Sequence, residues 1–351
     1  MKDKHAILII ISLASIFIFI SNSDGLGLTK DSYYYLSQSQ QLSRMGAIEY
    51  LMAYGWHQKL LIFVIYLLGG IKCTWLAIVN TVLWLATIWV WLKATRQLWP
   101  TFDWFFFGVM LACSTPMLMG VSFLWTESIF YLVIGMGYLV WQGDHLSKWV
   151  WAIPLIILLV FARKAGMIVI LGIGFYELLL VRMPSYLKTL MVLVLGILIY
   201  IFYGNFGFPN MIGELPDKAY LFQNIQYDAQ ILGRWMSPWL HLPVGILVLL
   251  SFPFIYFFGL RKEAFMALIV IMTYIFVRWY YQREFLEEHE RYLSVIWPFF
   301  WIVVIELLQK AQKFRFYLRA KAFAYALIFL YQLVRVTKNA ILWSESGCMI
   351  S

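Results

Sequence analysis

Charged side chains are scarce in this chain of 351 residues: only 13% are Asp, Glu, Lys or Arg, and 63% are hydrophobic. Soluble domains are close to half apolar and about a quarter charged. The shortage of charge therefore excludes an ordinary soluble globular protein and predicts an all-α polytopic membrane protein. Aromatic residues make up 19% of the chain, which suits the belts that Trp and Tyr form at membrane interfaces.

Cysteine is also rare, with three residues and no paired spacing, which argues against a disulfide framework and against a zinc site. We expect Cys113 in the core. Cys73 and Cys348 both fall on the outer side of the membrane in the layout below, and whether they pair stays open. The sequence has no Walker loop, HExxH helix or GxGxxG turn, so nothing points to nucleotide hydrolysis or to a bound dinucleotide.

Long apolar runs dominate the chain, which we interpret as one integral membrane domain, 1–351, with about eleven spans. The predicted spans are Ala6–Ile20, Thr74–Leu92, Trp104–Gly120, Leu124–Trp141, Trp149–Ala162, Gly166–Val181, Leu187–Tyr203, Leu242–Leu260, Ala264–Tyr281, Tyr292–Leu308 and Phe323–Val336. The run Leu60–Gly70 is too short to cross a bilayer, which takes roughly 20 residues. We expect it to form a half-buried juxtamembrane helix.

The distribution of basic residues sets the orientation. Lys2 and Lys4 precede the first apolar run, which resembles a signal sequence but which we interpret as a retained span that starts in the cytoplasm. In this layout the inner segments, including the cluster Lys310–Lys321, carry a clear excess of Lys and Arg, as the positive-inside rule requires. The net charge of +9 then reflects topology, and no nucleic-acid partner is needed. We expect a bacterial cytoplasmic-membrane protein with its functional face outside.

Two long polar connectors lie on that outer face, at 21–73 and 204–241. Connectors of this length are uncommon unless they have a function. In the first, Thr29 or Asp31 can cap a helix that runs towards Gly46. The second combines aromatic and amide residues, a mixture that suits carbohydrate but also any wet loop on a bilayer.

Two carboxylates on the outer side are candidates for chemistry. Asp31 could act as a general base on an acceptor hydroxyl or as a ligand of a divalent metal, or it could simply cap a helix. Glu127, at the outer start of a predicted span, could be a second acid near the same site, or it could be favoured there by the helix dipole alone. A metal could bind both only if folding brings them close.

Basic residues near the outer surface form the second group of candidates. Arg163 and Lys164 interrupt a strongly apolar stretch, and charges placed there are functional candidates by default. Arg291 adjoins a predicted span, where a guanidinium can hold a phosphate with two hydrogen bonds. Each could instead belong to a turn or a solvated charge run. His289, beside Arg291, is a weak signal for a base.

The order of these motifs resembles the GT-C superfamily of membrane glycosyltransferases, which includes protein mannosyltransferases and aminoarabinose transferases. The likeness rests on KDSYYYLSQSQQL after the first span, a half-buried helix, and then three short motifs in order. These are Pro116 followed by Thr126–Phe130, Phe161–Gly166, and Glu290–Tyr292 followed by Pro298. It covers most of the chain at the level of layout. His57 matches a His-Pro pair of the family, but here Gln58 follows it.

The resemblance implies a polyprenyl-phosphate sugar as donor, a glycan or lipid-linked acceptor, and a site reached from the outer leaflet. Asp31 would activate the acceptor hydroxyl or bind a metal, with Glu127 as the second acid. Arg163, Lys164 and Arg291 would hold the lipid phosphate. The remaining residues that we expect to bind substrate are Tyr34, Tyr35, His57, His289 and Tyr292.

Two other interpretations stay open. The first is a flippase or transporter of lipid-linked oligosaccharide, or a non-catalytic membrane subunit; transporters often show internal repeats and broken helices. No repeat is visible here, and the polar residues gather at the outer surface. The second is an O-antigen-type polymerase, which tends to have large late loops rather than a first loop with a leading Asp.

Overall fold

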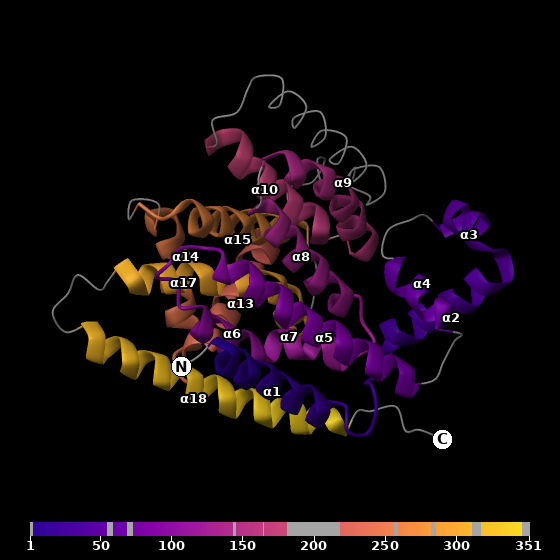
Figure 1. Ribbon diagram of the computed structural model, residues 1–351, viewed down its shortest axis with the longest axis horizontal. Coiled ribbons are helices and arrows are strands. Elements are labelled where there is room, and N and C mark those ends of the chain that lie inside the picture. Colours follow the sequence, from indigo (N-terminus) through magenta and orange to yellow (C-terminus); the bar gives the residue numbers. More distant parts are fainter. Residues whose placement is uncertain are drawn as a thin grey trace. The chain divides into compact units, whose positions relative to one another are not determined.

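The computed structural model describes residues 3–54, 59–68, 73–142, 145–163, 165–180, 218–255, 259–281, 286–310 and 317–345. Within these ranges the protein is helical, and the only β-type pairing is an isolated bridge between Gly27 and Phe123 (Figure 1). The prediction of an all-α fold is therefore confirmed.

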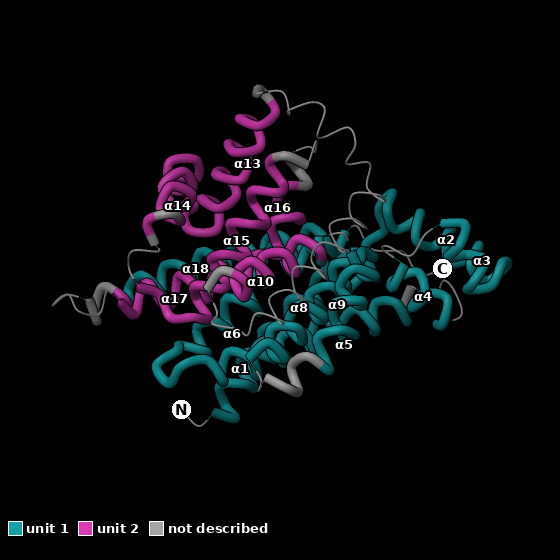
Figure 2. The backbone as a smooth tube through the Cα atoms, turned by 90° about the horizontal axis from the view of Figure 1, so that it is seen from above, with its two compact units in different colours: residues 1–166, 322–351 teal, residues 167–321 magenta. Residues whose placement is uncertain are grey.

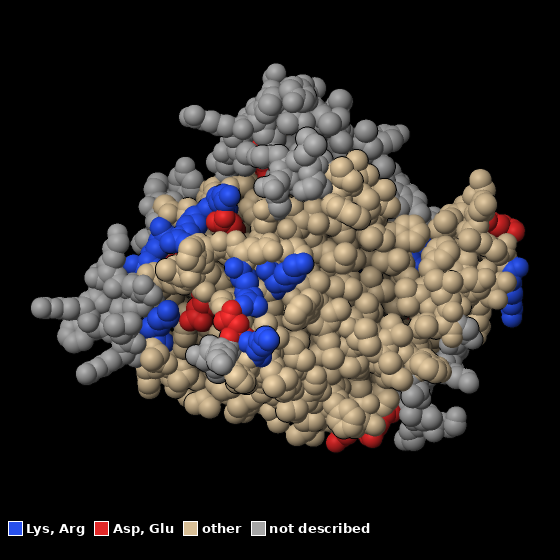
Figure 3. Space-filling view, in the orientation of Figure 1, with Lys and Arg blue, Asp and Glu red and all other residues tan. Residues whose placement is uncertain are grey.

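Three helical segments are long and apolar enough to cross a membrane: Asp3–Ser21, Trp75–Arg96 and His289–Lys310. Two bent helix pairs bring the number to five if each pair counts as one span. Figure 3 shows a face that is mostly uncharged, with Lys, Arg, Asp and Glu confined to small clusters. These features support a membrane protein. The layout of about eleven spans stays a prediction, and its span Leu187–Tyr203 lies outside the described residues.

The chain divides into two compact units, coloured separately in Figure 2. Unit 1 comprises Met1–Gly166 and Ala322–Ser351. Its helices are α1 (Asp3–Ser21), α2 (Lys30–Met45), α3 (Ala47–Tyr54), α4 (Leu60–Leu67), α5 (Cys73–Arg96), α6 (Trp104–Ala112), α7 (Thr115–Ser122), α8 (Glu127–Trp141), α9 (His145–Ala162) and most of α18 (Tyr317–Ser344). Helix α5 packs against α1, α6 and α8. Trp91 of α5 stacks on Tyr138 of α8 with ring centroids 5.2 Å apart.

The stretch Trp104–Gly120 was predicted as one span, but it forms two helices, α6 and α7, bent by 46°. The local sequence explains the break. Ser114 caps α7 by accepting a hydrogen bond from the Met117 amide at 3.1 Å, and Pro116 follows in the first turn, where proline favours a helix start.

Unit 2 comprises Met167–Lys321. Its elements are α10 (Ala165–Leu180), α13 (Lys218–Met236), α14 (His241–Ile255), α15 (Lys262–Tyr281), α16 (Leu286–Leu293), a 3-10 turn (Ser294–Ile296) and α17 (Trp297–Lys310). The described part of the predicted second outer loop is thus largely helix. Residues Tyr220–Met236 and His241–Phe252 meet at a bend of 102°. Their backbones approach so closely that a Cβ on Gly245 would lie 1.6 Å from the Ala229 carbonyl oxygen.

Candidate functional site

The candidate site begins at the first turn of α2. Thr29 is the N-cap, because its amide donates to the Ser32 hydroxyl at 2.9 Å, and the helix ends before Gly46, as the sequence predicts. Asp31 therefore lies in the first turn and does not cap the helix, which corrects the capping interpretation of this residue. A carboxylate in the first turn sits at the positive end of the helix dipole. Its exposure is intermediate.

This first turn packs against the segment that precedes α8. Ser32 donates its hydroxyl proton to the Leu124 carbonyl at 3.1 Å, and the Trp125 indole N–H donates to the Thr29 hydroxyl at 2.8 Å. Glu127, the first residue of α8, follows two residues after Trp125. The fold thus brings the starts of α2 and α8 together, and with them the segments that carry both candidate carboxylates.

Glu127 is fully buried and forms an ion pair with Arg163, whose exposed fraction is 4%. Arg163 follows α9 directly and its amide donates to the Leu159 carbonyl at 3.0 Å, so the end of α9 places the guanidinium. Two residues that the sequence proposed for different roles therefore neutralise each other. Lys164 and His57 lie outside the described residues.

The tyrosines that follow Asp31 differ in environment. Tyr34 is about half exposed, whereas Tyr35 is buried, and their rings meet edge to face at 5.8 Å between centroids. Because helix positions i, i+4 and i+7 share a face, Asp31, Tyr35 and Gln38 line one side of α2. Gln38 then lies about 10 Å from Asp31 along the helix axis.

Lys59 is a buried cation that the sequence did not single out. Its exposed fraction is 4%, and its ammonium donates to the Tyr50 hydroxyl at 3.2 Å, which in turn donates to Gln38 Oε1 at 2.6 Å. The ammonium also lies 5.0 Å and 5.7 Å from the ring centroids of Tyr50 and Tyr54. Burial lowers the pKa of Lys59 and raises that of Tyr50. A lysine just before an apolar helix gives no signal that distinguishes a buried side chain from an exposed one.

In unit 2 two of the predicted residues near 290, His289 and Arg291, are buried, whereas Tyr292 is half-buried. All three take part in contacts with aromatic rings. His289 meets the Tyr227 ring edge to face at 5.1 Å. The guanidinium carbons of Arg291 and Arg278 lie 5.6 Å and 5.9 Å from the centroid of the Tyr292 ring. These are cation–π distances, so both arginines contact the Tyr292 ring. Binding of substrate by Tyr292 stays a prediction.

The same unit contains a polar cluster between α13 and α15. Arg278 pairs with Asp228 at 3.6 Å, and the Trp279 indole N–H donates to the other Asp228 oxygen at 3.0 Å. The sequence analysis did not single out Asp228, because it interpreted residues 204–241 as a loop. Only in a helix does it become clear that Asp228 lies on the inward-facing side.

No group of three or more His, Cys, Asp or Glu side chains is arranged for a metal ion within the described ranges. The possible divalent metal at Asp31 stays a hypothesis. The chain was compared with protein-family models, with curated proteins and with solved structures. None of the three comparisons found a match.

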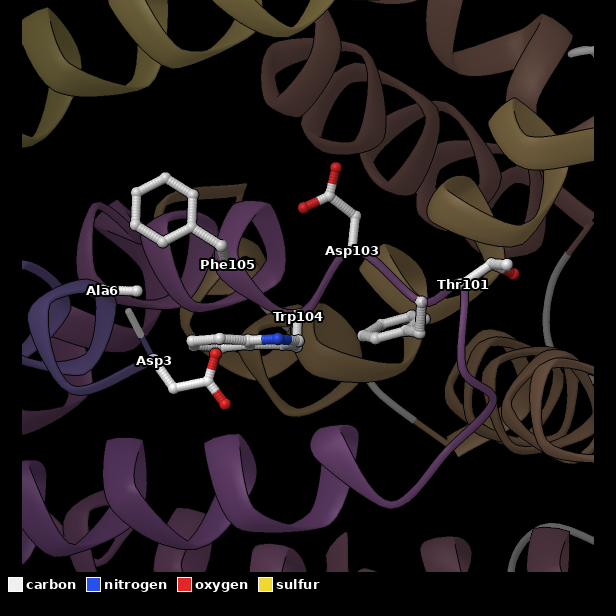
Figure 4. A pocket seen from close by; sticks show the side chains of 7 residues that line it. Asp3, Ala6, Thr101, Asp103, Trp104 and Phe105 are labelled. Atoms are coloured by element: carbon white, nitrogen blue, oxygen red, sulfur yellow. The ribbon is translucent and has the colours of Figure 1, made fainter. Parts of the chain in front are cut away.

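A pocket of about 410 Å³ opens elsewhere in unit 1, between α1 and the turn before α6 (Figure 4). Asp3, Thr101, Asp103 and Trp104 are among its lining residues. Both carboxylates are engaged, since Asp3 pairs with Arg96 and Asp103 caps α6 by accepting from the Phe106 amide at 3.1 Å. This pocket lies where the starts of α1 and α6 meet and is not the candidate site.

Proposed function

We propose that this protein is a membrane glycosyltransferase that moves a sugar from a polyprenyl-phosphate donor to a hydroxyl of a glycan or lipid-linked acceptor at the outer face. The acceptor oxygen bonds to the anomeric carbon, the bond from that carbon to the phosphate oxygen breaks, and polyprenyl phosphate leaves. Asp31 takes the proton of the acceptor hydroxyl. The observation that carries the proposal is a partly exposed carboxylate, Asp31, in the first turn of α2 together with the buried Lys59 ammonium. The ammonium is linked through the Tyr50 hydroxyl to Gln38, which shares a face of α2 with Asp31.

The two groups suit the two ends of the reaction. The leaving phosphate gains charge as the glycosidic bond breaks, and a cation in a water-poor site stabilises that charge strongly. Within the described part of the chain, the Lys59 ammonium contacts the Tyr50 hydroxyl and the rings of Tyr50 and Tyr54, and none of these groups carries a negative charge. We assign the phosphate to Lys59, and the role of Arg291 in holding it stays a prediction from the sequence.

Glu127 receives a positioning role in this scheme. It is fully buried and paired with Arg163, so it is a poor candidate for taking a proton from an acceptor that arrives from water. The pair instead anchors the start of α8 to the end of α9. Removal of one partner leaves a buried unpaired charge, which is strongly destabilising.

The test uses purified protein in liposomes that contain polyprenyl-phosphate sugars, with transfer followed by mass spectrometry of lipid extracts. Asp31→Asn should lower kcat by roughly 10²- to 10⁴-fold, the usual contribution of a general base. Asp24→Asn is the matched control, because Asp24 is an exposed carboxylate in the same outer segment. Lys59→Gln should impair use of the donor. Full transfer by a well-folded Asp31→Asn protein would remove Asp31 from catalysis.

A second candidate function is transport of a lipid-linked sugar. The observation in its favour is the 102° break between α13 and α14 together with the buried Asp228–Arg278 pair, since broken helices with polar partners mark transport sites. A fluorescent lipid-linked sugar separates the two functions. Movement of this probe between leaflets without chemical change, abolished by Asp228→Asn and unaffected by Asp31→Asn, would favour transport.

A further inference from the structure

Three side chains form a hydrogen-bonded relay around Asp31. The Trp125 indole N–H donates to the Thr29 hydroxyl at 2.8 Å, the hydroxyls of Thr29 and Ser32 lie 3.2 Å apart, and Ser32 reaches the Leu124 carbonyl at 3.1 Å. Because Leu124 and Trp125 are joined by a peptide bond, the relay closes into a ring. Asp31 lies between Thr29 and Ser32 in the sequence.

Elementary donor counting fixes the direction of every bond in the relay. An indole nitrogen only donates and a carbonyl only accepts. Ser32 must therefore use its single proton on Leu124, and Thr29 must use its proton on Ser32. The Ser32 oxygen then accepts from the Thr29 hydroxyl and from the Thr29 amide at 2.9 Å, which fills its capacity. Because each hydroxyl can donate in only one direction, the hydrogen bonds have a single pattern, and this pattern holds the first turn of α2 in one orientation.

Backbone contacts extend the relay into a wider contact between the two segments. The Gly27 amide donates to the Ser122 carbonyl at 2.9 Å, and the Leu124 amide donates to the Gly27 carbonyl at 3.0 Å. A Cβ on Gly27 would lie 2.3 Å from the Phe123 ring, so this approach needs glycine. From α5, the buried Asn80 amide donates to the Phe123 carbonyl at 3.2 Å and so fixes the segment from the other side.

We infer that Thr29, Ser32 and Trp125 are positioning residues that hold the Asp31 carboxylate in a fixed place relative to the start of α8 and its Glu127. This inference rests on the proposed function for its kinetic meaning. Misplacement of a catalytic group by about 1 Å can cost roughly 10²-fold in rate. The relay acts on Asp31 through the backbone on both sides of it and does not touch the substrate.

The experiment compares Trp125→Phe and Thr29→Val with two controls. Trp125→Phe keeps an aromatic ring against Phe123, whose centroid lies 4.7 Å away, but loses the indole N–H. Trp84→Phe is the matched control, because Trp84 is also buried and its indole nitrogen has no hydrogen-bond partner among the residues that the structure describes. Thr29→Ser, which keeps the hydroxyl, is the rescue variant. The readouts are kcat and KM separately, and hydrogen exchange of the Gly27 and Leu124 amides.

We expect kcat to fall roughly tenfold to a hundredfold in Trp125→Phe and Thr29→Val, with KM little changed and with faster exchange of both amides. Trp84→Phe and Thr29→Ser should behave like the wild type. Unchanged kcat in both relay variants, while Asp31→Asn abolishes transfer, would overturn the positioning role and leave the proposed function intact. If the wild type transfers no sugar, hydrogen exchange is the remaining test. Unchanged exchange rates of the Gly27 and Leu124 amides in Trp125→Phe would then refute the relay.

Discussion

Asp228 and Arg278 lie 3.6 Å apart, from Oδ1 to Nη1, inside unit 2. Their exposed fractions are 1% and 4%, so this ion pair between α13 and α15 is withdrawn from water. A buried ion pair contributes little net stability, but each charge offsets the cost of burying the other. The pair therefore holds the polar helix α13 against the apolar helix α15, because separating the helices would leave two buried charges without a partner. Its own net contribution to stability is small.

The single variants at this pair should both be destabilising, and the double variant should be less so. Arg278→Met leaves the buried Asp228 carboxylate with the hydrogen bond from the Trp279 indole but without its counter-charge, and we expect a loss of about 3–5 kcal/mol. Asp228→Asn/Arg278→Met removes both charges and should recover a good part of that loss. Thermal unfolding in detergent measures the cycle. Additive effects of the two changes would show that the groups do not interact.

Lys59 predicts a dependence of stability on pH. Burial lowers its pKa from the ordinary 10.5, so between the folded-state pKa and 10.5 the unfolded chain binds the proton and the folded chain does not. Stability must therefore rise with pH across that window. Lys59→Met should abolish this rise and should stabilise the protein most at the acidic side of the window. Melting curves of both proteins from pH 7 to 10 test this. Parallel curves would contradict the buried, uncompensated charge.

The same variant should separate stability from activity. If Lys59 holds the donor phosphate, Lys59→Met gains stability and loses transfer at the same time. This trade is expected where a group is kept in an unfavourable environment for its function. If Lys59→Met is more stable and fully active, Lys59 does not hold the donor phosphate.

The sequence predicted well what composition and short-range chemistry control. The shortage of charge predicted a helical fold with helices apolar and long enough to span a membrane, and Thr29 and Gly46 marked the ends of α2. It also named Asp31 and Glu127, which the fold places on adjoining segments. The positions of Asp31 and Glu127 along the chain do not reveal that their segments meet. That contact depends on long-range hydrogen bonds such as the one from Ser32 to the Leu124 carbonyl.

Burial and partner choice could not be predicted in the same way. Hydropathy treated 104–120 as one span because it averages over the cap at Ser114 and the proline at 116. Nothing in the order of residues indicated that Arg278 would pair with Asp228, because the two residues lie 50 positions apart on different helices. Lys59 was overlooked because its burial results from the packing of α2, α3 and α4, and not from its neighbours in the chain.

The close approach of Gly27 to Phe123 predicts a pair of variants that compensate. Gly27→Ala should destabilise unit 1, because its Cβ would lie 2.3 Å from the ring. Phe123→Ala should also destabilise it by removing the ring that stacks on Trp125. Since the second change removes the atoms that the first one meets, the double variant should be more stable than the sum of the two predicts. Thermal melts of the wild type, the two single variants and the double variant test this prediction. Strictly additive losses of stability would contradict the close approach of Gly27 to the Phe123 ring.

The crossing of α13 and α14 gives the sharpest test of the fold of unit 2. A Cβ on Gly245 would lie 1.6 Å from the Ala229 carbonyl oxygen, and a backbone atom cannot move aside as a side-chain end can. Gly245→Ala should therefore force the two helices apart and lower the melting temperature markedly. Gly137→Ala is the matched control, since nothing lies within 4 Å of its added methyl group in α8. There alanine should be neutral or stabilising by up to about 1 kcal/mol, because it favours the helix. Equal melting temperatures of the two variants would show that the backbones do not meet at this crossing.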